Sequence, residues 1–403
     1  MWSGIQRLGR APWVWALLAV LLVLAWQTLT VHANYAGDWT ALFRTGRTAP
    51  VPDSLARGTF RGAHPVGYDG QFYRLLAHDP FLRHGTAAYL DAPAMRWRRI
   101  GVPLAAWALA GGQPGAIDTA YLLVILGSIF AGVRYLGLIM AGMGRPAVLG
   151  LLFLGVPAVV VAADTMTVDV ALAALAAGFA WHWRRQGGEP GWGLWFTLAA
   201  AGLVRETGLL LAAGCLIAAG IRRNYRQAAF WGTAMLPALG WYGYAHLHLA
   251  LPAASASASV PGWVWPVPRL GIAMLAIHPV RYPLLGAAVE RLVRGLDSLA
   301  LGAMMGAAAL GLMRLRREKA AAIRAALALQ VALMLAIMTQ ESFWIPAYGY
   351  ARPFAPLFVW LLAGEAAGRA SKAAILVCAL VDLRVLAEME TQAVGVLRWL
   401  GWG

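Results

Sequence analysis

The sequence predicts an all-α polytopic membrane protein with about eleven transmembrane helices, and three observations support this. Hydrophobic residues make up 60% of the 403 residues and charged residues 13%, against about 25% charged residues in a soluble domain. Mean hydropathy is +0.63. The apolar residues form long runs separated by short basic clusters, which is the pattern of bilayer-crossing helices. We therefore expect a single transmembrane domain over residues 1–403.

The expected spans follow from the apolar runs and their basic ends. They are 12–32, 117–141, 147–163, 167–183, 190–204, 207–221, 228–249, 291–313, 321–339, 353–368 and 372–386. A cytoplasmic N-terminus places the basic clusters that follow the spans in short cytoplasmic loops, as the positive-inside rule requires. With an odd number of spans, the C-terminus is expected on the outer side.

The first apolar run has two interpretations. Arg7 and Arg10 precede it, and residues 31–33 (VHA) resemble a signal-peptidase site. Because the chain stays in the membrane afterwards, we expect an uncleaved first span.

Residues 186–221 lie between two basic clusters that both favour the cytoplasm. A single crossing would leave Arg205 and Glu206 at mid-bilayer, where an uncompensated charge costs about 2.5–3.5 kcal/mol. We therefore expect a short hairpin with its tip, residues 205–207, at the outer surface.

The net charge of +15 comes almost entirely from arginines. These arginines lie at span ends, so we attribute them to membrane topology and expect no nucleic-acid partner. Cys215 and Cys378 lie in apolar runs, which indicates neither a disulfide nor a cysteine-based metal site. The composition is typical of a GC-rich bacterial genome, and the expected location is the bacterial inner (cytoplasmic) membrane.

Two outer loops are long. The first, residues 33–100, carries nine arginines and five aspartates. This excess of positive charge has two interpretations: long loops tolerate charge, or the arginines attract an anionic substrate. Residues 70–81 predict an amphipathic interfacial helix with Phe72, Leu75 and Leu76 at the membrane boundary.

The second outer loop, residues 250–290, opens with an Ala-Ser tract at 254–259, followed by Trp263 and Trp265. An ordinary linker is the simpler interpretation and a lid is the alternative.

Ionisable residues mark the outer ends of several spans. Asp164 closes the third span, Arg205 and Glu206 form the hairpin tip, and Arg352 opens the tenth span. Charges at the hydrocarbon edge of several helices suit a site for a charged amphiphile, and the planar fork of arginine binds phosphate bidentately. Each residue also has a structural interpretation, as a helix cap, a snorkelling side chain or an ion pair.

Three segments resemble bacterial GT-C type membrane glycosyltransferases. Residues 67–73 (GYDGQFY), with 77–80 (AHDP), are similar to the first outer loop of the dolichol-phosphate-mannose-dependent mannosyltransferases. Residues 98–104 (RRIGVPL) and 203–210 (LVRETGLL) resemble two further segments of such proteins in order and spacing.

This resemblance implies a GT-C-like fold with interfacial helices in the first outer loop. It implies inverting transfer of a hexose or pentose from a polyprenyl-phosphate carrier to a glycan or lipid acceptor in cell-envelope glycan biosynthesis, on the periplasmic side. It places the catalytic carboxylate at Asp69, as the general base. The expected substrate-binding residues, from the motifs and the span ends, are Tyr68, Gln71, Tyr73, Arg98, Arg99, Asp164, Arg205, Glu206 and Arg352.

No cofactor is expected. Asp69 lacks the adjacent acid that many members of the family carry, so a divalent metal is not indicated, although Asp164 would be the residue to complete a site with Asp69. The alternative functions are a transporter or flippase of lipid-linked sugars, which needs polar groups near the midplane, and a scaffold without activity.

The topology is testable by cysteine labelling in intact cells. Phe60→Cys, Ser257→Cys and Ile345→Cys should react with a membrane-impermeant thiol reagent, because all three positions lie in expected outer loops. Gly187→Cys should stay unlabelled until the cells are opened, and its labelling in intact cells would contradict both the hairpin and the number of spans.

Overall fold

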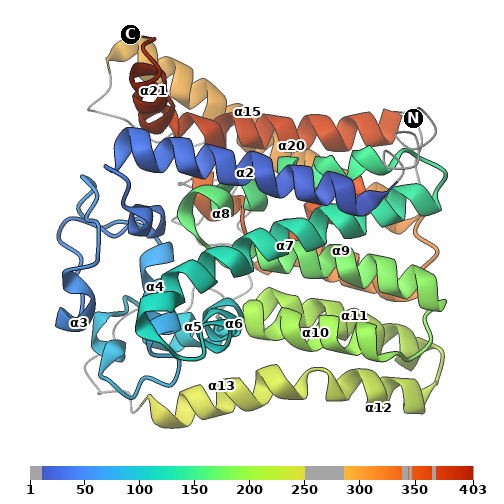
Figure 1. Cartoon of the computed structure of the whole chain (residues 1–403). Helices are drawn as coiled ribbons and strands as arrows, with labels where there is room; N and C mark the ends of the chain where they lie inside the picture. The colour runs from blue at the N-terminus through green and yellow to red at the C-terminus, as the bar shows by residue number, and fades with distance from the viewer. Residues whose placement is uncertain (1–10, 250–285, 338–343, 345–346, 365–368, 403) are drawn as a thin grey trace, which may run out of the picture.

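The computed structural model describes residues 11–249, 286–337, 344, 347–364 and 369–402 (Figure 1). These residues are helical and contain no named strand, and the β-pairing between them is an isolated bridge that joins Thr45 and Gly67. The predicted all-α class is therefore confirmed for the described part of the chain.

The longer helices occupy the predicted spans in chain order. They are α2 (Pro12–Asn34), α7 (Pro114–Gly142), η3 (Ala147–Gly155) with α8 (Pro157–Thr165), α9 (Asp169–Gln186), α10 (Trp192–Val204), α11 (Leu209–Ile221), α12 (Tyr225–Thr233) with α13 (Leu236–His248), α15 (Ala287–Leu315), α16 (Ala321–Ala332) with the π-helical turn η6 (Leu333–Ile337), α19 (Ala355–Leu362) and α20 (Arg369–Ala387).

The shorter elements lie mainly in the first outer loop. They are η1 (Trp39–Phe43), α3 (Asp53–Ala56), α4 (Gly70–His78), η2 (Thr86–Tyr89), α5 (Pro93–Arg98), α6 (Gly101–Leu109), η4 (Glu206–Gly208), α18 (Ala347–Tyr350) and α21 (Glu390–Trp399).

Membrane character is supported by three described helices, α2, α7 and α15, that are long and apolar enough to cross a bilayer. A fourth span results if η3 and α8, which are bent by 66° at their junction, are counted together. Pro157 begins α8 and cannot continue the hydrogen-bond ladder of η3, which accounts for the break. The other predicted spans contain shorter helices, so the count of eleven stays a prediction.

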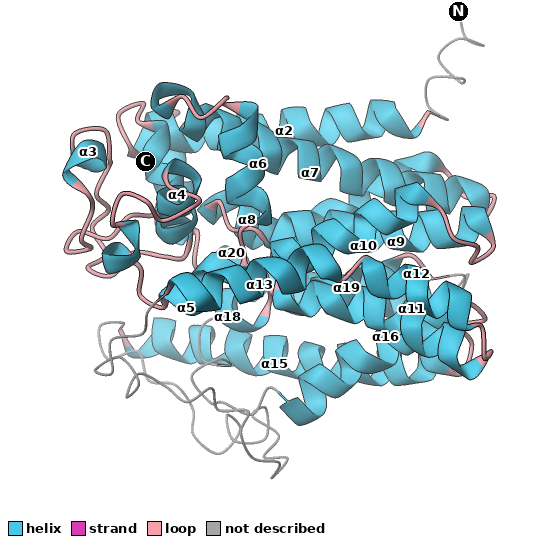
Figure 2. Cartoon of the chain, turned by 90° about the horizontal axis from the view of Figure 1, so that it is seen from below, coloured by secondary structure: helices cyan, strands magenta, loops and turns pink. Residues whose placement is uncertain are grey.

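The helices run alongside one another, and the short elements gather at one end of this helical body (Figure 1). We call it the loop end; it carries α3, α4 and α5. The C-terminal helix α21 also lies there, because Asn34 at the end of α2 donates to the backbone carbonyl of Gln392 (3.2 Å). α2 begins at the opposite end (Figure 2).

The predicted hairpin is present as a pair of helices. α10 and α11 have 13 residues each and meet at η4, so residues 205–208 form the tip. At about 1.5 Å per residue each helix is about 20 Å long, shorter than a bilayer core of about 30 Å.

The predicted interfacial helix needs correction. α4 ends at His78 rather than at residue 81, because Asp79 leaves the helical conformation before Pro80. Leu75 and Leu76 are 4% and 0% exposed, so they pack inside the protein instead of facing the membrane boundary.

The second outer loop is shorter than predicted at its C-terminal side. Residues 287–290 belong to the first turn of α15. Residues 250–285 of the expected loop, with the Ala-Ser tract, Trp263 and Trp265, lie outside the described residues.

Close helix packing gives a stability prediction. A Cβ on Gly214 of α11 would lie 2.7 Å from the Ala322 carbonyl oxygen of α16, whereas a Cβ on Gly220 of the same helix would meet nothing within 4 Å. Gly214→Leu should therefore separate the two helices and cost about 1–3 kcal/mol, lowering the melting temperature of the purified protein. Gly220→Leu is the matched control, and equal melting temperatures would contradict this packing.

Candidate functional site

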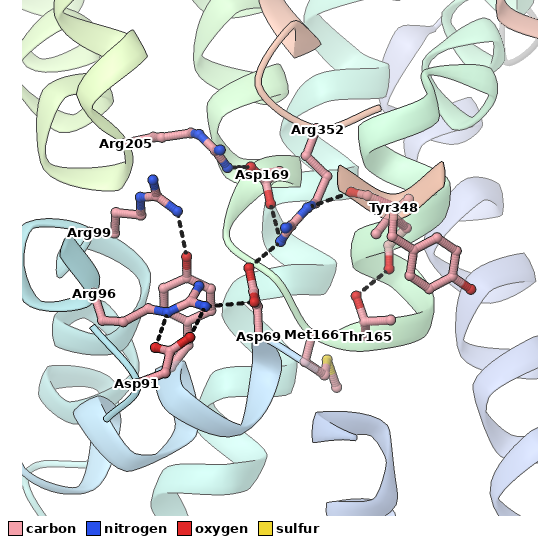
Figure 3. A network of polar contacts seen from close by, with 12 residues as sticks. Asp69, Asp91, Arg96, Arg99, Thr165, Met166, Asp169, Arg205, Tyr348 and Arg352 are labelled. Atoms are coloured by element: carbon pink, nitrogen blue, oxygen red, sulfur yellow. Dashed lines mark hydrogen bonds and ion pairs between the residues drawn. The ribbon is translucent and has the colours of Figure 1, made fainter. Parts of the chain in front are cut away.

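Asp69 lies between two arginines at the loop end (Figure 3). Its Oδ1 accepts a hydrogen bond from Nη2 of Arg96 at 2.8 Å, and its Oδ2 accepts from Nη1 of Arg352 at 2.7 Å. Arg96 and Arg352 are 5% and 8% exposed. A buried guanidinium is costly unless it is paired, so Asp69 stabilises both arginines at once.

The network continues on both sides of Asp69. Arg96 also binds both oxygens of the half-exposed Asp91, each at 2.8 Å. Arg352 lies 3.6 Å from the buried Asp169, which in turn binds Arg205. Acids and arginines therefore alternate through the cluster, which we call the charged cluster: Asp91, Arg96, Asp69, Arg352, Asp169 and Arg205.

Helix ends bring these residues together. Asp169 begins α9, Arg205 follows the last residue of α10, and Arg352 precedes α19. Asp69 immediately precedes α4, and the next residue must be small because a Cβ on Gly70 would lie 2.2 Å from the carbonyl oxygen of Thr165. The turn-prone Asp-Gly pair therefore allows the first outer loop to contact the end of α8.

A second ion pair joins the first outer loop to the hairpin tip. Nε of Arg99 donates to Oε2 of Glu206 at 2.9 Å, and its Nη1 donates to the hydroxyl of Tyr73 at 3.3 Å. Arg205 and Glu206 thus pair with Asp169 and Arg99, and not with each other.

Asp164 belongs to a neighbouring group. It accepts hydrogen bonds from Arg44 at 2.6 Å and from the Tyr348 hydroxyl at 3.2 Å. The backbone carbonyl of Tyr348 accepts from Nε of Arg352 at 2.8 Å, so this residue connects the two groups. Among the described residues, no three His, Cys, Asp or Glu side chains are grouped closely enough to hold a metal ion.

The arginines determine the ionisation of Asp69. Burial by itself would raise the pKa of its carboxyl group, but the positive charges of Arg352 and Arg96 outweigh burial and lower that pKa well below its ordinary value. The pKa of Arg96 is raised, since Asp91 and Asp69 more than offset its burial. Asp69 is therefore a carboxylate at neutral pH.

Several buried donors around Asp69 have no hydrogen-bond partner among the described residues. They are the hydroxyl of Tyr68, Nη1 of Arg96 and Nε of Arg205. The ring of Tyr68 lies under the guanidinium of Arg352, 4.9 Å from ring centroid to Cζ. Unsatisfied buried donors are costly, so these three are candidates to pair with the acceptor oxygens of a ligand.

Two of the predicted substrate-binding residues, Gln71 and Arg98, make their hydrogen bonds within the first outer loop and with neither group of charges. The side-chain amide of Gln71 binds the backbone of the first outer loop, accepting from Gly46 and donating to Val66. Arg98 donates to the carbonyl of Ala94, one turn earlier in α5. Both contacts lie within the first outer loop, and a substrate-binding role for the two residues stays a prediction.

Other members of the two groups were not among the predicted site residues. Arg96, Asp91 and Asp169 complete the charged cluster, and Arg44 and Tyr348 bind Asp164. Arg96 and Asp169 could have been added to the prediction, because Arg96 lies two residues before the 98–104 motif and Asp169 lies at the start of a predicted span. Arg44 carries no such signal, since its partner is 120 residues away.

Comparisons of the chain with protein-family models, with curated proteins and with solved structures find no match.

The buried pair of Asp169 and Arg205 gives a coupling prediction. Asp169→Asn leaves a buried guanidinium without its main counter-charge, which should cost about 3–5 kcal/mol and lower the melting temperature of the purified protein. The double variant Asp169→Asn, Arg205→Gln should lose less free energy of unfolding than the two single variants lose together. Arg98→Gln is the control, expected within about 0.5 kcal/mol of wild type. If the losses of unfolding free energy in the two single variants add up to the loss in the double variant, the two residues do not stabilise each other.

Proposed function

We propose that the chain is a membrane glycosyltransferase that moves a sugar from a polyprenyl-phosphate carrier to a glycan or lipid acceptor. The observation that carries this proposal is the position of Asp69, a carboxylate held between two arginines and surrounded by donors without partners. The likeness of residues 67–73, 98–104 and 203–210 to GT-C type enzymes supports the same reaction. The proposed fold is accordingly GT-C-like, with the active site on the periplasmic side.

In the proposed reaction, an acceptor hydroxyl oxygen attacks the anomeric carbon of the donor sugar and forms the new glycosidic bond. The bond from that carbon to the phosphate oxygen breaks, and the phosphate leaves with the electron pair. Asp69 takes the proton of the hydroxyl as it attacks, as a general base does. Attack opposite the leaving group inverts the configuration at the anomeric carbon.

The carrier phosphate would bind at the arginines of the charged cluster, where Nε of Arg205 and the hydroxyl of Tyr68 lack partners. Arg352 and Arg205 offer guanidinium groups suited to bidentate phosphate contacts, and the hydroxyl of Tyr68 adds a neutral donor. A phosphate that shares Arg352 would draw its charge away from Asp69. Because that charge lowers the pKa of Asp69, donor binding would make the carboxylate a stronger base when the acceptor is attacked.

The position of the cluster favours transfer over transport. Its members lie at the ends of α9 and α10 and before α19, at the loop end. An alternating-access transporter of lipid-linked sugars needs its polar site near the midplane. A reaction at one surface has no such requirement.

The proposal is tested by complementing a strain that lacks the gene. Asp69→Asn keeps the size of the side chain but cannot accept a proton at neutral pH, so transfer should fall about 10²-fold or more. The variant should fold with reduced stability, because Arg96 keeps its ion pair with Asp91 and Arg352 keeps the nearby charge of Asp169. Mass spectrometry of surface glycans and lipid-linked sugars measures transfer.

Asp53→Asn is the matched control, since Asp53 lies exposed in the same loop, and it should restore wild-type glycans. Two results would contradict the proposal: a strain without the gene whose glycans and lipid-linked sugars are unchanged, or a folded Asp69→Asn protein with wild-type transfer.

A further inference from the structure

A cavity lies between α5, α13 and the turn after α4. Its volume is about 390 Å³, and its lining includes Phe81, Arg83, Trp97, Tyr244 and His248. Ligand sites commonly have volumes of about 300–1,000 Å³, so this one suits a small molecule. Trp97 follows Arg96 in the sequence of α5, which connects the cavity to the residues that hold Asp69. Figure 2 shows α5 next to α13.

The aromatic walls of the cavity are fixed in place. Trp97 lies edge-on to Tyr244, with 5.4 Å between ring centroids, and Tyr244 is 3.9 Å from the ring of His248. The indole nitrogen of Trp97 donates to the carbonyl of Pro80 at 2.7 Å. The indole nitrogen of Trp241 donates to the carbonyl of Trp97 at 2.8 Å and so attaches α13 to α5. Trp97 is 1% exposed, so the half-buried Phe81 and Tyr244 are the rings that a ligand in the cavity would contact.

Asp79 shapes the remaining wall. Its two carboxylate oxygens accept the backbone N–H groups of Arg83 and His84 at 2.8 and 2.9 Å. Burial by itself would raise the pKa of the Asp79 carboxyl group, but these hydrogen bonds lower it below its ordinary value. The turn that carries Phe81 and Arg83 is therefore stabilised by a carboxylate at neutral pH.

Polar groups complete the cavity. The guanidinium of Arg83 lies over the ring of Phe81, 5.2 Å from Cζ to the ring centroid. Nδ1 of His248 donates to the carbonyl of Tyr244 at 2.9 Å, which leaves Nε2 as the ring nitrogen for a ligand. With the Tyr244 hydroxyl, the cavity thus offers both donors and an acceptor beside aromatic faces.

We propose that this cavity binds an uncharged sugar ring and holds the sugar acceptor in the transfer reaction. The weakly positive C–H groups of a pyranose pack on the negative faces of aromatic rings, while its hydroxyls pair with Arg83, Tyr244 and His248. An acyl chain would make no use of the hydrogen-bonding groups of Arg83, Tyr244 and His248, and a phosphate would find more cationic groups in the charged cluster. The acceptor role rests on the proposed function, whereas sugar binding does not.

The test uses the full-length protein in lipid nanodiscs and two probes, methyl α-mannopyranoside and methyl β-glucopyranoside. Saturation-transfer NMR should show magnetisation passing to ring protons of at least one glycoside. Phe81→Ala and Tyr244→Ala, each removing one aromatic contact, should weaken that binding roughly tenfold. Arg83→Gln, which changes an exposed side chain and should leave the fold intact, should weaken it as well.

Phe196→Ala is the control, because this aromatic residue of α10 is 61% exposed and far in sequence from the cavity lining, and it should bind the glycosides as wild type does. Failure of both glycosides to bind, or equal binding by wild type and all three cavity variants, would overturn the proposal. Octyl glucoside serves as a third probe: saturation confined to its alkyl protons would assign the cavity to an acyl chain and would also overturn the proposal.

Asp69→Asn separates this inference from the proposed function. It should lose transfer and keep glycoside binding, because Asp69 does not line the cavity. If the wild-type protein binds glycosides but transfers no sugar, the cavity is a sugar-binding site and does not hold the acceptor of a transfer reaction. If Phe81→Ala and Tyr244→Ala transfer sugar at the wild-type rate, the cavity takes no part in the reaction. The proposed function is unaffected by that result.

Discussion

The ion pairs of Asp69 with Arg96 and Arg352 are the interactions on which the loop end depends. Two largely buried guanidinium groups approach one carboxylate from segments 256 positions apart in the chain. Neither arginine is stable in a buried position without a counter-charge. The first outer loop, the segment before α19 and the ends of α9 and α10 are consequently constrained to meet. The small size of Gly70 allows the loop to come close enough for that contact.

The same ion pairs determine how an anionic ligand would bind to the charged cluster. Every arginine of the charged cluster already contacts a carboxylate, so an incoming phosphate has to share these cations rather than find them unpaired. The donors without partners show where such a ligand could gain hydrogen bonds that the protein does not provide itself. A cluster of alternating charge can therefore hold buried arginines ready for a phosphate without the repulsion that a purely basic pocket would suffer.

Helix α5 connects the two proposed sites. Arg96 contributes to the charged cluster and Trp97 to the aromatic cavity. An anionic donor and an uncharged acceptor sugar require different chemistry: paired cations for the first, and aromatic faces with hydroxyl partners for the second. Each proposed site takes one residue from this short helix, and its other members come from elsewhere in the chain. The hydroxyl of Tyr242, which donates to the Gly202 carbonyl at 2.5 Å, also fixes α13 close to the hairpin tip.

The sequence alone determined the helical class, the positions of the main helices and the tip of the hairpin, because these depend on local hydropathy and on charges at helix ends. It also indicated Asp69, Arg205 and Arg352 through motifs and span ends. The tertiary structure decided which charges pair. Arg205 binds Asp169 and not its neighbour Glu206, and Asp164 joins Arg44 in a group separate from Asp69. It also decided that Leu75 and Leu76 are buried in protein. Partner choice and burial depend on which distant helix ends are neighbours in space, and that information is not contained in any single segment of the sequence.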